Sequence, residues 1–456
     1  MPRDGAGLHL SPGSRVAIVG GGPAASFAAL HLLRLAGQLA LPIAVTIFER
    51  KDFSRRGPAG CNKCAGILSV HATRGIQELG LQIPEHLVLA RLEGYTLHMA
   101  GHAIEIARPQ PNRTILSVYR GGGPLRGDLP PDVSFDAWLL AAACAAGATL
   151  VAANVRKLIA GPLMDVVTDN GRESFDLVML ATGINAAPPA TEGFDYTPPK
   201  TEVMAQDELA LRTPLSASQR RRAHVYVGQQ AGLIFGALIP KGDYLNLSLL
   251  GHDLSGDPVK AFLARPDCGW LGEAQAGRMC GCRPRIAVAP APRPFADRFV
   301  AVGDAAVTRL YKDGIGSAYL TAGRAAWTAL REGIAARAFA AGYAPLCRAI
   351  ARDNRIGQWL FAPWEGRQTP LYHLWERGWA RLLLAEEALP IQQRRGHLAL
   401  WNMLTGDDSY SSITRSALHP RILGALAAGL IAEIWPRRGA VRPLRPAYGA
   451  EAVASP

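Results

Sequence analysis

A glycine-rich turn near the start of the chain has residue types and spacing suited to phosphate binding. Gly20-x-Gly22-x-x-Ala25 separates an apolar stretch from a segment rich in alanine and leucine. In such a turn the first glycine permits the sharp bend, the second lets the backbone approach a pyrophosphate, and a small third residue lets helix and strand pack closely. The anion then lies at the helix N-terminus, where backbone N–H groups favour negative charge. The pattern predicts a dinucleotide site, with an ordinary glycine-rich turn as the alternative.

An acidic residue after the next apolar stretch supports the dinucleotide interpretation. Residues 43–48 form that stretch, and Glu49 follows it directly. A carboxylate at this place accepts hydrogen bonds from ribose hydroxyls and disfavours the 2′-phosphate of NADP. No second Gly-x-Gly-x-x-Gly turn is evident, so the sequence indicates no dedicated NAD(P)H domain.

Two later segments indicate which dinucleotide is bound. Residues 176–183 form an apolar strand with a small-residue turn, and residues 299–306 form another that carries Gly303-Asp304. An acid just beyond a strand can bind the hydroxyls of a flavin ribityl chain. Gly314-Ile315-Gly316 then opens a helix whose N–H groups can face the pyrimidine edge of a flavin.

Together, these segments resemble the three FAD-binding signatures of the flavoprotein group that contains aromatic hydroxylases and geranylgeranyl reductases. The resemblance covers roughly residues 14–335, and the motifs come in the family order. It implies FAD as the cofactor, held by Gly20, Gly22, Ala25, Glu49, Arg120, Gly303, Asp304, Gly314, Ile315 and Gly316.

Two further motifs narrow the resemblance. Arg120, followed by Phe135-Asp136-x-x-Leu139, resembles an arginine element that lies near the cofactor in the family, with residues 121–133 inserted between its halves. Residues 236–249 resemble the substrate-sheet motif of the geranylgeranyl reductases and their quinone-linked relatives, without its usual aromatic residue. The absence of this aromatic residue predicts a substrate cavity with a different shape. The tryptophan-containing motif of flavin halogenases is absent at the same place.

The resemblance implies an FAD-dependent oxidoreductase that reduces alkene bonds of an isoprenoid or another apolar substrate. The alternatives are an FAD-dependent monooxygenase of a hydrophobic substrate and a quinone-linked electron-transfer flavoprotein. A protein that keeps FAD as a structural element forms a further, non-catalytic class. The external electron donor stays open between NADH, NADPH and ferredoxin.

Two cysteine pairs are candidates for chemistry. Cys61-Asn62-Lys63-Cys64 lies in a basic loop, and Cys64 matches the cysteine of a Cys-Gly element in the geranylgeranyl reductases. Its basic neighbours favour thiolate, and we expect Cys64 to be a catalytic acid or redox partner. Cys280-Gly281-Cys282 is the second pair. Three interpretations of these two pairs are open: inert thiols that line a pocket, a redox-active thiol or disulfide, and a four-thiolate metal site. The last lacks the usual paired spacing, so we predict no metal.

A charged loop precedes the last glycine pair. Tyr311-Lys312-Asp313 stands where relatives carry proline and small residues. We expect Lys312 to hold negative charge at the N1–O2 edge of a reduced flavin, as a second catalytic residue. A solvated turn is the alternative.

The order of these elements predicts an α/β fold. It consists of a doubly wound, Rossmann-like FAD-binding domain, an inserted antiparallel-sheet substrate domain and a helical C-terminal region. Residues 315–339 have the pattern of one long helix. The predicted boundaries are 1–14 for a loose N-terminus, 15–90, 115–190 and 285–340 for the FAD-binding domain, 91–114 and 191–284 for the substrate sheet, and 341–456 for the helical, Trp-rich region.

Composition and charge exclude several classes of protein. The 456 residues are 49% hydrophobic and 19% charged, which excludes a disordered or coiled-coil chain. The formal net charge of +12 is scattered, so nucleic-acid binding is not expected. Seven cysteines in a chain of this length do not indicate a secreted disulfide scaffold. Residues 1–15 lack the apolar core of a signal peptide, which predicts a cytoplasmic protein.

The C-terminal end predicts peripheral contact with a membrane surface. Residues 422–432 are uncharged and apolar but too few to span a bilayer. Several arginines follow in residues 436–456. An apolar helix beside arginines fits a helix in the membrane interface, with contact through residues 421–445. A buried helix over the cavity is the alternative, and both imply an apolar small-molecule or lipid substrate.

Overall fold

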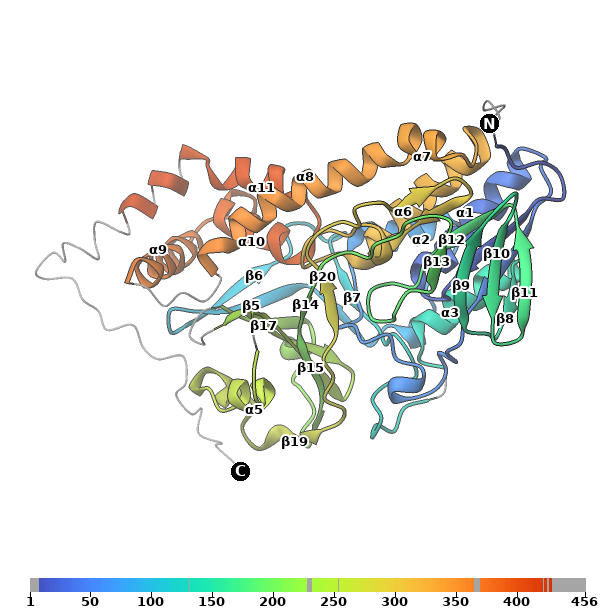
Figure 1. Ribbon diagram of the computed structural model, residues 1–456. Helices are drawn as coiled ribbons and strands as arrows, with labels where there is room; N and C mark the ends of the chain where they lie inside the picture. Colours follow the sequence, from blue (N-terminus) through green and yellow to red (C-terminus); the bar gives the residue numbers. More distant parts are fainter. Residues whose placement is uncertain are drawn as a thin grey trace, which may run out of the picture. The chain divides into compact units, whose positions relative to one another are not determined.

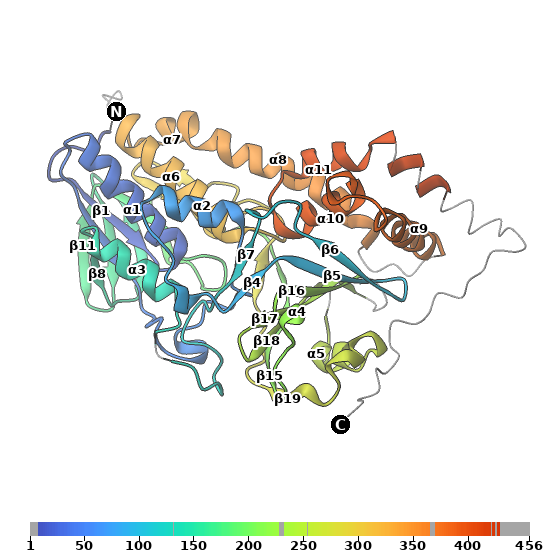
Figure 2. The same ribbon diagram turned by 180° about the vertical axis from the view of Figure 1, so that it is seen from behind.

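Two units, each assembled from three separate stretches of sequence, make up the structure (Figure 1 and Figure 2). The computed structural model describes residues 8–130, 132–227, 232–252, 254–364, 370–420, 422–424 and 426–428. Unit 1 comprises Met1–Leu89, Leu116–Glu202 and Arg283–Gly357. Unit 2 comprises Ala90–Ile115, Val203–Cys282 and Gln358–Pro456.

Unit 1 is built on a six-stranded sheet with the order β21-β22-β12-β1-β2-β8, in which every neighbouring pair except β21–β22 is parallel. A parallel sheet is covered on both faces, and its central strands are therefore largely apolar. The strands are β1 (Arg15–Val19), β2 (Ala44–Phe48), β8 (Thr149–Val151), β12 (Leu177–Leu180), β21 (Phe295–Ala296) and β22 (Phe299–Ala301).

Alternate residues of β1 show the layers of unit 1. Val16 and Ile18 belong to the core shared with the helices, and Ala17 and Val19 belong to the core shared with a second, four-stranded sheet. The helices of the first core are α1 (Pro23–Gln38), α2 (Val70–Glu78), α3 (Phe135–Ala145), α6 (Gly314–Arg331), α7 (Ala336–Gly342) and the first part of α8 (Ala344–Phe361). The second sheet has the order β11-β10-β9-β13, from β9 (Val155–Ala160), β10 (Met164–Thr168), β11 (Gly171–Phe175) and β13 (Ala190–Glu192).

The prediction of one long helix over residues 315–339 is wrong in one respect. The helix is interrupted, because α6 ends at Arg331 and α7 begins at Ala336. Gly333 has φ +112, a conformation that side chains rarely adopt. A Cβ atom there would also lie 2.6 Å from the backbone oxygen of Leu8. That oxygen instead accepts a hydrogen bond of 2.7 Å from the N–H of Ile334. A tertiary contact with the start of the chain thus accompanies the break between α6 and α7.

Unit 2 is built on a seven-stranded sheet with the order β19-β15-β18-β17-β16-β5-β6, which is antiparallel except between β16 and β5. Leucines of its strands form a core with α5 (Pro258–Leu263). The strands are β5 (Gly94–Met99), β6 (His102–Ala107), β15 (Ala205–Leu211), β16 (Arg222–Val227), β17 (Leu233–Lys241), β18 (Tyr244–Gly251) and β19 (Gln275–Arg278).

Helices dominate the C-terminal part of the chain. They are α8 (Ala344–Phe361), α9 (Pro370–Glu386), α10 (Arg395–Thr405) and α11 (Tyr410–Ala417). Short strands and one short α-helix add to the described fold: β3 (Ile67–Leu68), β4 (Ala90–Leu92), β7 (Ile115–Ser117), β14 (Thr201–Val203), β20 (Arg285–Ala287) and α4 (Ala217–Arg220). The predicted α/β class with a parallel sheet, an antiparallel sheet and a helical C-terminal region is confirmed.

The tryptophans of the C-terminal helices divide between core and surface, and Trp359 of α8 is 64% exposed. Trp401 of α10 is fully buried, and Trp379 of α9 is buried as well. None of the helices in the described part of the chain has the length and apolarity needed to cross a membrane. Of the segment 421–445, for which membrane contact is expected, only 422–424 and 426–428 are among the described residues.

Candidate functional site

The predicted phosphate turn joins β1 to α1 and is closed on one side by close packing. Gly20 has φ +106, and a Cβ atom there would lie 2.6 Å from the backbone oxygen of Ala181. At Gly21 a Cβ atom would lie 2.8 Å from the side chain of Glu49. Ala25 is fully buried, as expected for the small residue that lets α1 pack on the sheet. The backbone path of the turn therefore requires small residues on this side.

Gly22 differs because it faces open space. A Cβ atom built on it would meet only Nδ2 of Asn62, at 3.6 Å. Gly22 is also the N-cap of α1, where no side chain caps the helix and no acidic residue stands in the first turn. Because Pro23 has no N–H group, the N–H groups of Gly22 and Ala24 are the ones available to an anion at this helix end. An accessible glycine beside an uncapped helix N-terminus fits a pyrophosphate.

Glu49 is oriented by backbone donors. Its Oε2 accepts a hydrogen bond of 2.7 Å from the N–H of Gly21, and its Oε1 accepts one of 2.8 Å from the N–H of Lys51. The carboxylate is half-buried at the end of β2. A carboxylate held in this way presents its remaining lone pairs in a fixed direction, as ribose recognition requires.

The third predicted segment packs directly on the phosphate turn. Gly303 has φ +61, and a Cβ atom there would lie 2.7 Å from Cβ of Ala24 in the first turn of α1. This close approach places Asp304 next to the same turn. Burial raises the pKa of Asp304, whereas Arg120 and the Thr308 hydroxyl lower it. Asp304 is partly accessible despite its deep position, which suits a carboxylate that binds ligand hydroxyls.

The N-terminus of α6 is formed by Asp313 and the glycines after it. Asp313 is the N-cap, with φ +51, and its Oδ1 accepts a hydrogen bond of 3.2 Å from the N–H of Gly316. The hydroxyl of Ser69 donates to the same oxygen at 2.5 Å. Gly314 is exposed and Ile315 is buried, so the helix end opens to its surroundings beside an apolar anchor. Burial raises the pKa of Asp313, and the Ser69 hydroxyl and Arg309 lower it.

Arg120 lies at the centre of a buried polar cluster. Its Nε donates to Oδ1 of Asp136 at 2.5 Å, and Asn62 donates from Nδ2 to the other oxygen of Asp136. Burial by itself would lower the pKa of Arg120. The negative charge of Asp136, together with smaller contributions that include Cys64 and Asp304, more than offsets this effect, and the pKa is raised. The guanidinium is therefore within electrostatic reach of both the cysteine loop and the ribityl-binding candidate.

The insertion at residues 121–133 packs against the cysteine loop. A Cβ atom at Gly121 would lie 2.7 Å from Cα of Cys61, and one at Gly122 would lie 2.2 Å from the backbone oxygen of Ser54. The guanidinium of Arg56 also donates to backbone oxygens of residues 127 and 129. The glycines of the insertion thus permit two loops to lie backbone against backbone, next to Arg120.

Cys61 and Cys64 are both half-buried in this loop. The ammonium group of Lys51 donates to the backbone oxygen of Cys61 at 2.9 Å and to Oδ1 of Asn62 at 3.3 Å. Burial lowers the pKa of Lys51, and Glu49 is the strongest opposing influence. Cys64, a predicted catalytic residue, lies in the field of Arg120.

Lys312 follows Tyr311, which has φ +60, and precedes Asp313, with φ +51. Left-handed non-glycine residues cost of order 1–3 kcal/mol each and cluster at functional sites. Lys312 is half-buried between them. Its predicted catalytic role stays a prediction.

The second cysteine pair belongs to unit 2, whereas Cys61 and Cys64 belong to unit 1. The N–H of Cys280 donates to Oδ1 of Asp207 at 3.0 Å, and Cys282 pairs with the backbone of Gln206. Among the described residues, no group of three or more His, Cys, Asp or Glu side chains could hold a metal ion.

The substrate-sheet motif of residues 236–249 contains a buried polar network. Lys241, at the end of β17, is 1% exposed. Its ammonium lies 3.5 Å from Oε1 of Glu208 on β15, on the far side of β18. Asn246 donates to the same oxygen at 2.9 Å, and Ser248 donates to Asn246 at 2.8 Å. Burial raises the pKa of Glu208, and Lys241 opposes that effect. An apolar sheet thus carries a polar cluster at the positions that resemble a substrate motif.

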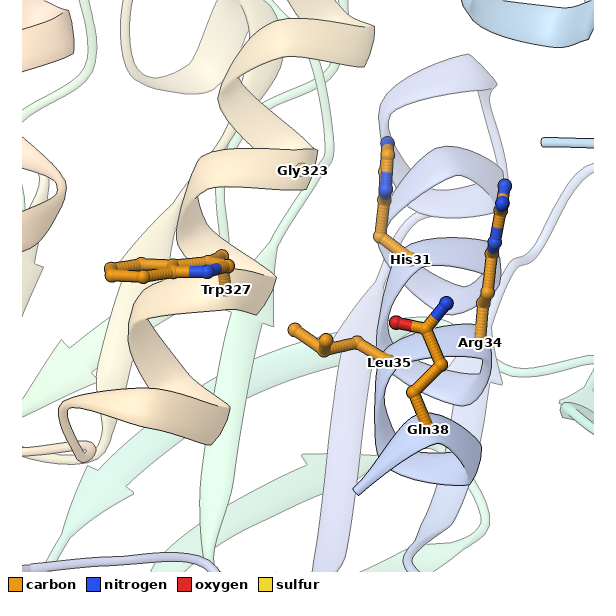
Figure 3. Close-up of a pocket in the computed structure, with 6 residues that line it drawn as sticks. All are labelled: His31, Arg34, Leu35, Gln38, Gly323 and Trp327. Carbon is orange, nitrogen blue, oxygen red and sulfur yellow. The ribbon is translucent and has the colours of Figure 1, made fainter. Parts of the chain in front are cut away.

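A hollow of about 270 Å³ lies between α1 and α6 (Figure 3). Its walls come from the C-terminal half of α1 and the middle of α6, and none of them is a predicted site residue. Eight residues of α-helix separate His31 from the start of α1, about 12 Å along the axis. The hollow is therefore distinct from the phosphate turn. It is lined by His31, Arg34, Leu35, Gln38, Gly323 and Trp327.

The predicted site residues of the three FAD signatures, with Arg120, Cys64 and Lys312, all belong to unit 1. The sequence predicted no role for Lys51, Asn62, Asp136 or Asp313. Asp313 precedes the Gly-x-Gly that opens a helix, which is an N-cap pattern. Asp136 and Asn62 stood inside recognised motifs, but their pairing depends on the tertiary fold.

Comparison with known proteins supports the fold. No family model and no curated protein matches the chain. A geranylgeranyl bacteriochlorophyll reductase-like protein from Thermoplasma acidophilum matches with a TM-score of 0.65 and 14% identity, over 92% of this chain and 100% of that chain. A flavin-dependent halogenase matches with a TM-score of 0.60 and 18% identity, over 92% and 78% of the two chains.

A p-nitrophenol 4-monooxygenase from Pseudomonas putida matches with a TM-score of 0.56 and 12% identity, over 87% of this chain and 100% of that chain. These likenesses extend over most of each chain. The protein therefore has the fold of the flavoprotein group in which such reductases, halogenases and monooxygenases occur.

Proposed function

We propose that the protein is an FAD-dependent oxidoreductase. The observation that carries the proposal is the contrast at the phosphate turn. Gly20 and Gly21 are closed by packing, whereas Gly22 faces open space beside an uncapped helix N-terminus. Asp304 is brought to the same turn through the packing of Gly303 on α1. The residues present thus fit a dinucleotide that also carries a polyhydroxylated chain, as FAD does.

In this proposal, each part of the cofactor has its own group of residues. Gly22 and the first turn of α1 hold the pyrophosphate, and Glu49 accepts hydrogen bonds from the ribose. Asp304 binds the ribityl hydroxyls. The exposed end of α6 at Gly314 directs N–H groups toward the pyrimidine edge, where Lys312 adds positive charge. When bound, FAD would supply the transfer of a hydride.

We further propose that the substrate is an isoprenoid or another apolar alkene. The resemblance of residues 236–249 to a substrate motif supports this, and so does the likeness to a geranylgeranyl bacteriochlorophyll reductase-like protein. Cys64 beside Arg120 offers a thiol proton for the carbon that does not receive hydride. Lys312 and Cys64 are thus the candidate catalytic residues.

Purification and anaerobic turnover test this function. We expect the protein to be yellow, to release FAD on denaturation, and to saturate an alkene bond of a geranylgeranyl substrate without oxygen. NADH, NADPH and reduced ferredoxin would each be supplied in turn as the electron donor. A colourless protein that gains no flavin spectrum with added FAD would contradict the cofactor proposal.

A monooxygenase is the second candidate. The observation that favours it is the likeness to a p-nitrophenol 4-monooxygenase over 87% of this chain. Monooxygenation consumes oxygen in step with product and adds one oxygen atom to it, whereas alkene reduction proceeds anaerobically. Turnover of a hydrophobic phenol that stops when oxygen is removed would favour this candidate. Turnover only with a quinone as acceptor would favour an electron-transfer flavoprotein.

A further inference from the structure

Two of the seven cysteines occupy one short loop over the phosphate turn. Cys61 and Cys64 are separated by two residues, and both are half-buried. Cys268 and Cys347 are buried, and burial raises the pKa of their thiols to about 12 and about 11 respectively. A thiol with such a raised pKa is a poor nucleophile at neutral pH. The pair at 61 and 64 is set apart by its position, because Asn62 between the two cysteines lies at Gly22 of the phosphate turn.

The loop is fixed at both ends by backbone hydrogen bonds. The N–H of Cys61 donates to the oxygen of Gly57 at 2.8 Å, and the N–H of Asn62 donates to the oxygen of Arg120 at 3.0 Å. Farther along, the N–H of Val118 donates to the oxygen of Gly66 at 2.8 Å. Ordering the chain in advance reduces the conformational entropy that ring closure between two thiols would cost.

Each sulfur atom has its own donor and its own cation. The N–H of Lys63 donates to Sγ of Cys61 at 3.2 Å, and the N–H of Gly66 donates to Sγ of Cys64 at 3.5 Å. Lys51 interacts electrostatically with Cys61, and Arg120 with Cys64. N–H donors at a sulfur atom and cations near it stabilise negative charge there, both on an attacking thiolate and on a leaving one.

The backbone between the two cysteines turns sharply. Lys63 has φ +51 and the chain bends at Cys64. A disulfide requires its Cα atoms to approach to about 4.4–6.8 Å. Tightening of the bend into a four-residue turn would bring residues 61 and 64 within that range.

We propose that Cys61 and Cys64 form a redox-active dithiol that closes reversibly to a disulfide over the phosphate turn. The co-reactant is a low-molecular-weight disulfide such as oxidised glutathione. One protein thiolate attacks it to give a mixed disulfide and one released thiol. The second protein thiolate then attacks the mixed disulfide, so that the protein S–S bond forms and a second thiol leaves. Two protons pass from the protein thiols to the two leaving thiolates, and two electrons reduce the small disulfide.

Closure of this dithiol would act on the cofactor site, a consequence that rests on the proposed function. Asn62, between the two cysteines, donates to Asp136 and lies at the open space of Gly22. The disulfide constrains Asn62 and moves the Cys64 sulfur relative to Arg120. We therefore expect the affinity for FAD to change about threefold or more between the dithiol and disulfide forms.

Mass spectrometry of the full-length protein tests the proposal. The protein would be equilibrated in glutathione buffers of stepped redox ratio, alkylated with iodoacetamide, and digested with trypsin without reduction. Trypsin cleaves after Lys63, so only a disulfide between Cys61 and Cys64 joins peptide 57–63 to peptide 64–74. We expect this linked pair to appear over a single transition, with both cysteines protected from alkylation at the same ratio.

Single variants supply the controls. Cys61→Ser and Cys64→Ser should each lose the linked peptides and carry a stable glutathione adduct on the remaining thiol. Cys144→Ser, on α3, should retain the transition unchanged. The proposal is overturned if both wild-type cysteines stay alkylated at every ratio, or if each forms only its own glutathione adduct.

FAD content in the same samples separates this proposal from the proposed function. Linked peptides in a protein that binds no FAD would support the dithiol and contradict the flavoprotein assignment. Bound FAD without linked peptides would support the flavoprotein assignment and contradict the dithiol. An unchanged FAD affinity across a complete transition would contradict the coupling between the dithiol and the cofactor site.

Discussion

At the residue scale, neighbouring glycines of one turn have different physical tasks. Position 20 requires glycine because its φ is positive and because a Cβ atom there would collide with the backbone of Ala181. At Gly22 a Cβ atom would contact only Asn62. A side chain at Gly20 would disturb the fold, but a side chain at Gly22 would fill space that the proposed pyrophosphate needs. Gly22 is therefore the position at which cofactor binding can be tested without breaking the turn.

Gly22→Val should abolish FAD binding while the protein remains folded. The valine methyl groups would occupy the approach to the N–H groups of α1. FAD retained after purification, measured by absorbance against protein, should fall by about tenfold or more. Gly37→Val is the matched control, because Gly37 lies on the same helix with open space around it. Stoichiometric FAD in the Gly22 variant would refute the proposed pyrophosphate position.

Asp304→Ala should weaken FAD binding without abolishing it. Hydrogen bonds to a charged group contribute about 1.5–3 kcal/mol, which corresponds to about a 10- to 100-fold rise in Kd. Flavin fluorescence titration of the apoprotein measures this change. Asp304→Asn should fall between the alanine variant and the wild type, because its amide oxygen still accepts a hydrogen bond. An unaltered Kd in Asp304→Ala would place the ribityl chain elsewhere.

At the element scale, the site depends on loops that lie closely against each other. The insertion at residues 121–133 carries glycines whose missing side chains allow contact with the cysteine loop. This contact holds Arg120 and Cys64 in the same cluster, although 55 residues separate them in the sequence. A substitution that forces these loops apart should therefore affect the cofactor site from a distance.

Gly122→Val should displace the cysteine loop. Its Cβ would lie 2.2 Å from the backbone oxygen of Ser54, which cannot move without shifting the loop. Overpacking of this kind costs about 1–3 kcal/mol of stability. We expect a lower urea midpoint, weaker FAD binding and faster alkylation of Cys61 and Cys64. Gly269→Val, at an exposed position with no atom within 4 Å, should leave all three measurements unchanged.

The sheet of unit 2 contains a buried pair of histidines. Nε2 of His98 lies 3.0 Å from Nδ1 of His224, and their rings stack on Tyr226 and Trp270 respectively, each at 4.0 Å between centroids. Burial lowers the pKa of His98 from 6.5 to about 4 and that of His224 to about 3. Arg265, Asp267 and Arg222 are the charged groups that also act on the pair.

These shifts predict that stability falls as the solution becomes acidic. Below pH 6.5 the unfolded chain takes up protons that the folded pair does not, and this difference persists until the pH reaches the folded values. Each histidine should cost about 1.4 kcal/mol of unfolding free energy per pH unit in that window. Urea unfolding at pH 7 and pH 5 measures the loss.

The double variant His98→Gln/His224→Gln should show a smaller loss between these two pH values. His86→Gln, with a side chain that is 55% exposed, should keep the wild-type loss. Equal losses in the double variant and the wild type would show that other groups control the acid sensitivity.

At the scale of the whole molecule, charge and the C-terminal end predict an affinity for anionic lipid. The net charge is +12, and the arginines of residues 436–456 follow the apolar segment 422–432. Each Lys or Arg near such a surface contributes about 1 kcal/mol, so a few arginines shift a protein between free and bound states.

The full-length protein should sediment with phosphatidylserine-containing vesicles at low salt and be partly released at high salt. Screening weakens the attraction of charges at higher ionic strength, whereas apolar insertion is less affected. Deleting residues 421–456 should reduce sedimentation and leave FAD in place, because the predicted FAD residues precede residue 317. Failure of the full-length protein to sediment at low salt would favour the alternative, a helix over the cavity.

The sequence by itself determined the elements whose signals are local. The apolar run before Gly20, the small residues through Ala25 and the acid after β2 predicted a strand, a turn and a helix in the right places. Those features follow from backbone sterics and hydrophobic periodicity within a few residues. The succession of strand, helix and strand predicted the parallel sheet. It did not predict that helices would cover one face of this sheet and a second, four-stranded sheet the other.

Only the tertiary structure decided which distant groups meet. The pairing of Arg120 with Asp136 and the position of Asn62 at Gly22 depend on loops packed backbone to backbone, and such packing leaves no periodic signal in the sequence. The break at Gly333 likewise depends on Leu8, at the other end of the chain. Helical periodicity continues through residues 315–339, but a hydrogen bond across more than 300 residues accompanies the break after Arg331.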